Sequence, residues 1–556
     1  MRAAVRNTAY RRAAAPRAGA RVAACCGALL LGLAGCVAAG GPPPAARLTI
    51  ALPQEPQSLN PLFLSGAATA TIVPMIYSYL LTLDEHNRLR PDLAVAVPTQ
   101  ANGGISRDGK TIVYRLRRAA WQDGAPVTAA DVAFTFQAIM NPRNNVVSRS
   151  GYDAVASVEA IGARTVRVRL RRPYAPILST FLAPNQNYGV LPAHLLRGKA
   201  DLNHDAYDTR PIGSGPYRVV EWLHGDHLRL ERNRGYYGGA PSIAEIDLRF
   251  VADSTTILNQ LRTGEIDVAL VADPNLLAQY GTIRRERVVR APLAGVAQLF
   301  FNVRDPDLAD VRVRRALVEA LDLPRAVRDA TKGAERYADA GRGLFSWGYD
   351  PAIAPPPFDP AGAARLLDAA GWRRAPGGMR TKGGRALALE LAFVTGNPTA
   401  ASLGLVLQQQ LRAAGVQLAL HAYNPTEFRA PGSSGGPLFG GRYQLAFLEI
   451  YTPADPDTAW FFGCSQIPPN GFNVSRWCDP ATDRAELAGT STYDPAQRRR
   501  DAALVQRRVA AELPSVSLWQ QNAVYVVPAT LREFRPAEES PVWNVGTWRF
   551  DATPRP

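Results

Sequence analysis

Three short motifs combine residue types that act in acid–base, metal or nucleophilic chemistry. Asp455 and Asp457 form an Asp-Pro-Asp motif whose paired carboxylates suit general acid–base catalysis or metal binding. His224 and His227 share the segment HGDH and are potential metal ligands or proton carriers. Residues 432–436, GSSGG, match the G-x-S-x-G pattern of a nucleophilic serine. Each motif also has a structural interpretation, which depends on the elements around it.

The local context favours the structural interpretation at all three motifs. An Asp-Pro-Asp motif is more often a helix cap than a catalytic pair. His227 falls on the polar side of an alternating segment, so turn and surface roles fit the two histidines better. The GSSGG segment lies between Pro431 and Pro437, whereas a nucleophile elbow needs a strand before it and a helix after it. We therefore predict no catalytic residue and no enzyme activity, with a lipid-anchored hydrolase as the less favoured alternative.

The N-terminal segment has the composition of an export signal. Residues 1–21 contain six arginines and no acidic residue, and a short apolar run of about 13 residues follows. Because a transmembrane helix needs about 20 apolar residues, this run is too short to span a membrane. Leu33-Ala34-Gly35-Cys36 resembles a bacterial lipobox, in which the cysteine is lipidated and becomes the new N-terminus. We predict a lipoprotein signal peptide over residues 1–35, a lipidated Cys36 and a flexible tether over residues 36–47. An ordinary secretory signal with a chance cysteine is the alternative.

Length and charge bound the class of protein. A chain of 556 residues exceeds what one hydrophobic core usually serves, so two or three lobes are expected. The formal net charge is +15, and subtracting the six leader arginines leaves +9. These cations are interleaved with acids instead of being clustered, which argues against a nucleic-acid partner. No second long apolar run follows the leader.

The cysteines divide between the leader and one late segment. Cys25 and Cys26 leave with the predicted leader, and Cys36 is used for the lipid. Cys464 and Cys478 remain, fourteen positions apart. In an oxidising exterior they are predicted to form a disulfide, which would stabilise the fold by roughly 3 kcal/mol. A metal site is the weaker alternative because no histidine lies nearby, and we predict no metal ligand.

Hydrophobic periodicity predicts both strands and capped helices. Alternation with period two indicates strands at residues 111–117, 164–170, 227–232 and 245–251. Cap residues predict helices that begin after Thr128, Asp310 and Asp359.

Two stretches predict strand–helix–strand units. The first covers residues 244–271 and the second residues 387–423. Because more than 100 residues separate them, each is able to seed its own sheet. The sequence therefore predicts a bilobed α/β protein with its ligand between the lobes.

Several segments in order resemble one family, the family 5 extracellular solute-binding proteins, which are the peptide and nickel receptors of ABC importers. The resemblance covers nearly the whole mature chain. The segments that carry it include WQDGAPVTAADVAFTFQAI (121–139), PIGSGPYRVVEW (211–222), FNVRDPDLADVRVRRALVEALD (301–322) and DPDTAWFFGC with NVSRWC (455–464 and 473–478). The last pair is similar to the disulfide loop of the dipeptide-binding branch.

The resemblance implies an α/β, bilobed fold of the periplasmic-binding-protein-like type (type II, cluster C). It has two lobes, an extra inserted subdomain and a ligand cleft between the lobes. The implied ranges are 48–300 for lobe I, about 86–208 for its inserted subdomain, 301–518 for lobe II and 519–556 for the return to lobe I.

The resemblance also implies a function without catalysis. Such a receptor closes on a peptide by a hinge motion and delivers it to a permease pair driven by two cytoplasmic ATPases. It would be a monomer without cofactors, at the outer face of the cytoplasmic membrane or in the periplasm, anchored through Cys36. The matching segments line the ligand site of the family, and they place these candidate contacts in it: Glu55, Gln57, Ser58, Tyr451, Thr452 and Trp460.

Two positions depart from the dipeptide-binding branch. Where that branch has an aspartate for the peptide amino group, this chain has Thr452. Where it has an arginine for the carboxylate, this chain has Val394. Because an unpaired buried charge costs several kcal/mol, we expect oligopeptides to bind better than dipeptides. Glu55 is a candidate for one ligand charge. Haem, a nickel chelate, glutathione or an oligosaccharide remain alternative ligands on the same fold.

Overall fold

A computed structural model describes residues 46–64, 68–271, 273–337 and 340–551. The predicted signal peptide, the lipidated Cys36 and most of the tether lie outside these residues. Two large sheets organise the described chain, and two long strands of the second sheet connect two separate hydrophobic cores. We call the elements around the first core lobe I and those around the cores after residue 295 lobe II.

Lobe I is built on a four-stranded sheet with the strand order β1-β9-β8-β7. β1 pairs in parallel with β9, and the other pairs are antiparallel. In β8 the alternation that predicted a strand buries Leu228 and Leu230 completely. The bounds are Arg47–Leu52 (β1), Tyr217–Leu223 (β7), His227–Arg232 (β8) and Glu245–Phe250 (β9). Beside this sheet lie α1 (Thr69–Ile76) and the hairpin of β2 (Leu81–Leu83) and β3 (Leu89–Pro91).

A three-stranded sheet and several short helices fill the range expected for the inserted subdomain. The strand order is β4-β6-β5, with α2 packed against β5 and β6. Thr128 and Asp131 form the predicted capping box at the start of α2. The bounds are Thr111–Arg115 (β4), Ala129–Met140 (α2), Tyr152–Ala154 (η1), Val155–Ala160 (β5), Thr165–Leu170 (β6), Ile177–Thr180 (α3), Pro184–Gln186 (η2), Ala193–Leu196 (α4) and Ala206–Asp208 (η3).

The six-stranded sheet has the order β10-β18-β11-β17-β15-β16. β15 and β16 are parallel neighbours joined by α11, as the sequence predicts for residues 387–423. The bounds are Ala269–Leu270 (β10), Glu286–Phe301 (β11), Ala388–Val394 (β15), Pro398–Ala413 (α11), Gln417–Tyr423 (β16), Leu445–Tyr451 (β17) and Ser515–Pro528 (β18).

The first predicted strand–helix–strand unit, residues 244–271, does not form a single sheet as expected. α5 (Ser254–Thr263) does follow β9, but β9 and β10 belong to different sheets. β1 pairs in parallel with β9 on one side, and its Ile50 forms a bridge with Val268 on the other. The N-terminal strand therefore occupies the place between the two strands of the unit.

Helices cover the six-stranded sheet on the lobe II side. Asp310 and Asp359 cap α7 and α10 with their side chains, as predicted. The helix bounds are Val311–Glu319 (α7), Leu323–Ala330 (α8), Ala340–Phe345 (α9), Pro360–Ala369 (α10), Pro425–Phe428 (α12), Pro437–Gly440 (α13), Ala459–Phe462 (α14), Pro480–Ser491 (α15) and Pro495–Glu512 (α16).

Short elements complete the described chain. They are Pro274–Leu276 (η4), Leu277–Tyr280 (α6), Ser346–Gly348 (η6), Arg373–Arg374 (β12), Arg380–Lys382 (β13), Arg385–Ala386 (β14), Gly432–Ser434 (η7), Cys464–Gln466 (η8), Leu531–Arg532 (β19), Val545–Thr547 (η9) and Arg549–Phe550 (β20).

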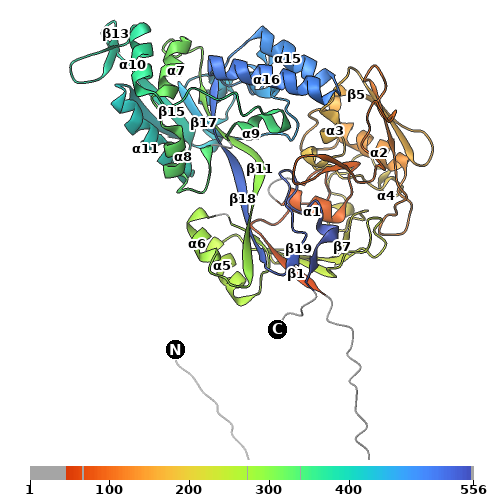
Figure 1. Cartoon of the computed structure of the whole chain (residues 1–556). Coiled ribbons are helices and arrows are strands. Elements are labelled where there is room, and N and C mark those ends of the chain that lie inside the picture. The colour runs from red at the N-terminus through yellow and green to blue at the C-terminus, as the bar shows by residue number, and fades with distance from the viewer. Residues whose placement is uncertain (1–45, 65–67, 272, 338–339, 552–556) are drawn as a thin grey trace, which may run out of the picture. The chain divides into compact units, whose positions relative to one another are not determined.

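β11 and β18 run side by side between the two lobes (Figure 1). Ala291 and Ala523 pack in the core of lobe I, whereas Ala297 and Trp519 pack in a core of lobe II. The β11–β18 ladder shifts register between Pro292 and Val296, where one core gives way to the other. One core thus gives way to the other inside these two strands.

Candidate functional site

The two lobes meet at Tyr451, the last residue of β17. Its hydroxyl lies 2.7 Å from Oδ1 of Asn185 and within hydrogen-bond distance of Oε2 of Glu539. Asn185 belongs to η2, and Glu539 follows β19; neighbours of both residues pack in the lobe I core. Tyr451 is 47% exposed. A tyrosine of lobe II therefore stands between two polar groups of lobe I.

The backbone after Tyr451 continues this contact. The N–H of Ala454 donates to Oε1 of Glu539 over 3.0 Å, and the N–H of Thr452 lies 3.3 Å from the carbonyl of Ala294 in β11. Thr452 is only 2% exposed, and its hydroxyl oxygen has no hydrogen-bond partner among the described residues. The structure thus brings Tyr451 and Thr452, both predicted from sequence, to the lobe contact.

A second contact joins the lobes at Tyr174. Its hydroxyl donates to Oδ2 of Asp457 over 3.3 Å, and the N–H of Ala175 donates to the carbonyl of Thr490 over 2.7 Å. Asp457 also accepts from the N–H of Ala459 at the start of α14. Asp455, in contrast, forms a two-pronged ion pair with Arg498. The helix-cap prediction for the Asp-Pro-Asp motif is therefore wrong for Asp455, whose carboxylate is used by the arginine.

Four acids lie at or behind these contacts: Glu539 and Glu486 are buried, and Glu538 and Asp457 are partly buried. Burial, with the neighbouring charge of Glu538, raises the pKa of Glu539 to about 8 against the hydrogen bonds from Tyr451 and Ala454. Burial also raises the pKa of Glu538 to about 7. Burial and the charge of Asp455 raise the pKa of Asp457, and burial and Asp457 raise the pKa of Glu486 to about 8. All four acids favour the neutral form more than they would in water.

Sequence reasoning missed Glu538 and Glu539. They occur in the segment PAEESP, which has the composition of an exposed turn between prolines. Their burial comes from contacts with residues far along the chain, namely Asn87 and Gln520 for Glu538 and Tyr451 for Glu539. No local sequence pattern contains these contacts, so neither acid could be recognised from the sequence.

Glu55 lies in a different environment from the one its predicted role suggests. Its carboxylate accepts from Nε1 of Trp222 and the N–H of Gly225, both at 2.9 Å, and lies 2.8 Å from Nδ1 of His224. Burial raises the pKa of Glu55, but these hydrogen bonds outweigh it, so the pKa is lowered. The acid thus holds the turn between β7 and β8 within lobe I.

The other predicted contacts are scattered. Gln57 is exposed, and Ser58 is buried with its hydroxyl accepting from the N–H of Asn60. Trp460, in α14, is 51% exposed, and its ring centroid lies 5.4 Å from that of Phe472. Val394 ends β15 and is partly buried against a lobe II core.

The histidines and the GSSGG segment take structural positions. His224 contacts Glu55 in the turn after β7, and His227 begins β8 beside Asp226. Residues 432–434 form a single turn, and Gly435 has a φ of +88°. This is a loop and not the strand–turn–helix of a nucleophile elbow.

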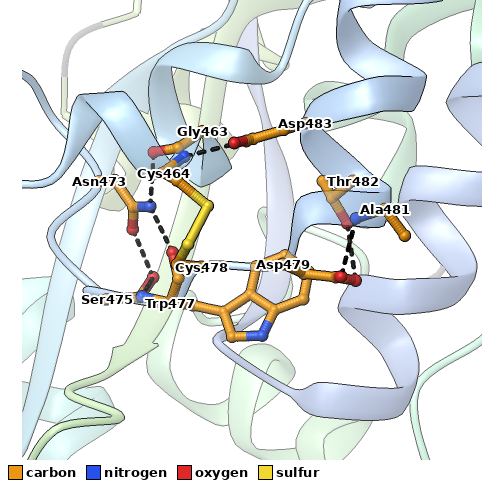
Figure 2. The surroundings of a disulfide bond; sticks show 10 residues. All are labelled: Gly463, Cys464, Asn473, Ser475, Trp477, Cys478, Asp479, Ala481, Thr482 and Asp483. Carbon is orange, nitrogen blue, oxygen red and sulfur yellow. Dashed lines mark hydrogen bonds between the residues drawn. A yellow bond between two sulfur atoms is a disulfide. The ribbon is translucent and has the colours of Figure 1, made fainter.

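Cys464 and Cys478 form the predicted disulfide (Figure 2). Asn473 supports the loop by donating to the carbonyls of Gly463 and Trp477, and the N–H of Cys464 donates to Asp483. The alternative of a metal site at these cysteines is therefore wrong. Over residues 46–551, as far as they are described, no group of three histidine, cysteine or acidic side chains is placed to hold a metal ion.

A large hollow lies elsewhere on lobe I. It measures about 670 Å³ and is lined in part by Arg47, Arg218, Glu231, Arg234 and Glu245. Arg47 and Arg218 pair with Glu245 and Glu231. None of the predicted ligand contacts lines this hollow. Within the described part of the chain, no helix combines the length and the apolar character needed to cross a bilayer.

The sequence profile of the bacterial extracellular solute-binding proteins, family 5 Middle, matches residues 88–468. Protein XP55 of Streptomyces lividans is 29% identical, over 92% of this chain and 91% of that protein. The oligopeptide-binding protein AppA of Bacillus subtilis is 24% identical, over 92% of each chain. The crystal structure of NikZ from Campylobacter jejuni in complex with Ni(L-His) superposes with a TM-score of 0.71 at 26% identity, over 91% of this chain and 99% of that one.

Proposed function

Because this chain belongs to the bacterial extracellular solute-binding proteins of family 5, we propose that it captures oligopeptides for an ABC importer by closing its two lobes around them. Permease subunits in the membrane would receive the peptide. The name of the relative AppA, an oligopeptide-binding protein, supports this class of ligand. β11 and β18, which connect the two cores, are the natural hinge.

The observation that carries the ligand preference is the absence of charge at two positions. Thr452 lies buried at the lobe contact, and Val394 is partly buried in lobe II. A dipeptide enclosed here would bring both its ammonium and its carboxylate close to uncharged side chains. Since leaving a buried charge unpaired costs several kcal/mol, a longer peptide whose ends reach water or other charges is favoured.

Tyr451, Thr452 and Trp460 are the contacts we propose in lobe II, and Gln57 and Ser58 those in lobe I. A peptide backbone held in an extended conformation would hydrogen-bond to the strand ends, while its side chains occupy hydrated space. Glu55 would supply a charge only by exchanging its hydrogen bonds to His224, Trp222 and Gly225. We therefore assign Glu55 the weakest role among the six proposed ligand contacts.

Calorimetry tests the preference directly. We expect Ala-Ala to bind weakly or not at all and tri- to pentaalanine to bind measurably. Tight binding of Ala-Ala would contradict our interpretation of Thr452 and Val394. Native mass spectrometry of the purified protein identifies a co-purified solute, so a nickel chelate or haem found there would replace the peptide in this proposal.

Anchoring at Cys36 forms part of the proposal. Two acyl chains on this cysteine would suffice for stable membrane attachment, and residues 37–46 would tether the folded part. Cys36→Ser should release the protein from the membrane fraction while leaving its fold unchanged. A variant that stays membrane-bound would contradict the lipid anchor.

We also propose that the protein returns its ligand intact. Incubation with pentaalanine followed by mass spectrometry should show only the starting peptide. Cleavage products that persist in a repurified sample would support the hydrolase alternative.

A further inference from the structure

The number of protons at the Tyr451 contact is smaller than the number of acceptors. Tyr451 has one O–H, which is shared between Oδ1 of Asn185 and Oε2 of Glu539. Asn185 donates its amide Nδ2 to the hydroxyl of Thr180, which orients its Oδ1 toward Tyr451. The other oxygen of Glu539 already accepts from the N–H of Ala454. An ionised Glu539 therefore leaves two acceptors competing for one proton.

We infer that closing the two lobes takes up one proton from solvent, which binds to Oε2 of Glu539. The Glu539 O–H then donates to the Tyr451 oxygen, and the Tyr451 O–H donates to Oδ1 of Asn185. In this arrangement the Tyr451 hydroxyl, Oδ1 of Asn185 and both oxygens of Glu539 each have a hydrogen-bond partner, and the carboxyl that spans the lobes is neutral. The inference rests on the proposed hinge closure, because it is closure that brings Tyr451 of lobe II against Glu539 of lobe I.

The groups around Glu539 act in the same direction. Glu539 is only 5% exposed, and among the described residues its carboxylate bonds to the Tyr451 hydroxyl and the N–H of Ala454, not to an arginine or a lysine. Glu538 is adjacent in sequence and raises its pKa, and Tyr79 lies near enough for the two groups to repel each other when both are ionised. Arg342 of α9 is the nearby cation, and it acts on Glu538.

Glu538 provides an internal contrast. Its two oxygens accept from Nε2 of Gln520 and Nδ2 of Asn87, and an amide NH2 group can only donate. The carboxylate form of Glu538 is therefore satisfied without a proton. Glu539 is the acid that needs a proton, because the single O–H of Tyr451 cannot donate fully to both Glu539 and Asn185.

The sign of the pH dependence follows from burial. In contact the pKa of Glu539 is about 8. Separation of the lobes would remove Tyr451 and Ala454 from the carboxylate and admit water, so the pKa should fall toward the ordinary value of 4.5. Closure is thus fully favoured below about pH 4.5 and is progressively disfavoured up to about pH 8. Between these limits the closed-to-open ratio should fall about tenfold for each pH unit, which corresponds to one proton. The receptor would hold its solute more firmly in acidic surroundings.

Small-angle X-ray scattering of the purified protein from pH 5 to 9, with and without trialanine, measures the closed fraction. We expect the wild type to lose the compact form as the pH rises. In Glu539→Gln, the amide donates to Tyr451 as the protonated acid would, so the pH dependence should be shallower by one proton. Glu533→Gln is the matched control, because Glu533 lies in the same segment but pairs with Arg535 and Arg549.

The outcomes separate the two proposals. If no pH and no peptide contracts the wild type, hinge closure itself is wrong, and the inference falls with it. If the protein contracts with peptide but Glu539→Gln keeps the wild-type pH dependence, only the inference is wrong.

Infrared spectroscopy gives a second measurement that does not depend on Glu539→Gln folding. Because Glu486, Glu538 and Asp457 also have raised pKa values, the measurement is the difference spectrum between the wild type and Tyr451→Phe at pH 7. It should contain a shifted protonated carboxyl band, because the acceptor of the Glu539 proton is lost; a difference spectrum without such a band contradicts the inference.

Discussion

At each lobe contact a tyrosine of one lobe meets an acid of the other, but an arginine takes part only in the second contact. At the first, Tyr451 of lobe II meets Glu539 of lobe I, and no arginine or lysine pairs with that acid within the described chain. At the second, Tyr174 of lobe I meets Asp457 of lobe II, and Arg498 pairs with the neighbouring Asp455. A nearby guanidinium favours the charged form of an acid, whereas burial favours the neutral form. The acid that meets a tyrosine has a raised pKa at both contacts, whereas a guanidinium takes part only in the second.

The largest expected effect comes from removing the guanidinium at the second contact. Arg498→Leu leaves Asp455 without its partner beside Asp457 and Glu486. Since Arg498 is 9% exposed, the lost pair should lower the free energy of unfolding by about 3–5 kcal/mol, measured by urea denaturation at pH 7. The control is Arg500→Ala, an exposed arginine on the same helix that contacts Gln497, with an expected change within about 0.5 kcal/mol. If Arg498→Leu and Arg500→Ala lowered the free energy of unfolding by equally small amounts, the guanidinium would not distinguish the second contact from the first.

The next effect has the opposite sign and depends on pH. Glu486 is buried, with its pKa raised to about 8 by burial and by Asp457. An acid whose pKa is raised in the folded state makes the protein lose stability as the pH rises from about 4.5 to 8. Glu486→Gln removes this loss and keeps an acceptor for the Thr458 hydroxyl. We expect the variant to match the wild type at pH 4.5 and to exceed it by about 1–2 kcal/mol at pH 8 in denaturation experiments. A constant difference at both pH values would show that Glu486 does not titrate in this range.

The sequence predicted local features of the fold better than it predicted which residues meet at the lobe contacts. The caps of α2, α7 and α10 and the β15–α11–β16 unit follow from short-range patterns, because a cap or a crossover is formed by residues close in sequence. The resemblance also led to Tyr451 and Thr452. It did not lead to Glu539, which lies 88 positions from Tyr451, or to the His224 partner of Glu55, 169 positions away. Contacts of that separation are set by the packing of the lobes and leave no periodic trace in the chain.

A smaller effect is expected from the tyrosine of the second contact. Tyr174→Phe removes the hydrogen bond to Asp457 but leaves the ion pair of Asp455 and Arg498 intact. Net hydrogen bonds of this kind contribute about 1 kcal/mol, so the closed-to-open ratio should fall about fivefold, as measured by scattering at pH 7. Tyr493→Phe is the comparison variant: Tyr493 lies between α15 and α16 of lobe II, and its hydroxyl lies 3.3 Å from the lobe I carbonyls of Gly109 and Tyr174, so this variant removes a hydrogen bond between the lobes that involves no acid. A larger effect for Tyr493→Phe would mean that the acid is not the main partner in this contact.

The smallest effect should come from Glu55, an acid fully supplied with donors. Its pKa is lowered because the hydrogen bonds from His224, Gly225 and Trp222 outweigh burial, so its contribution to stability is present above pH 4.5 and is lost as the pH falls below that value. Its side chain is 29% exposed, so solvent weakens these interactions, and Glu55→Gln should cost only about 0.5–1 kcal/mol at pH 7. Denaturation at pH 7 and pH 3.5 should show the cost shrinking toward zero at the lower pH, the reverse of the trend expected for Glu486→Gln. If both variants changed stability with pH in the same direction, the presence or absence of donors and cations around a carboxylate would not be what decides its charge in this protein.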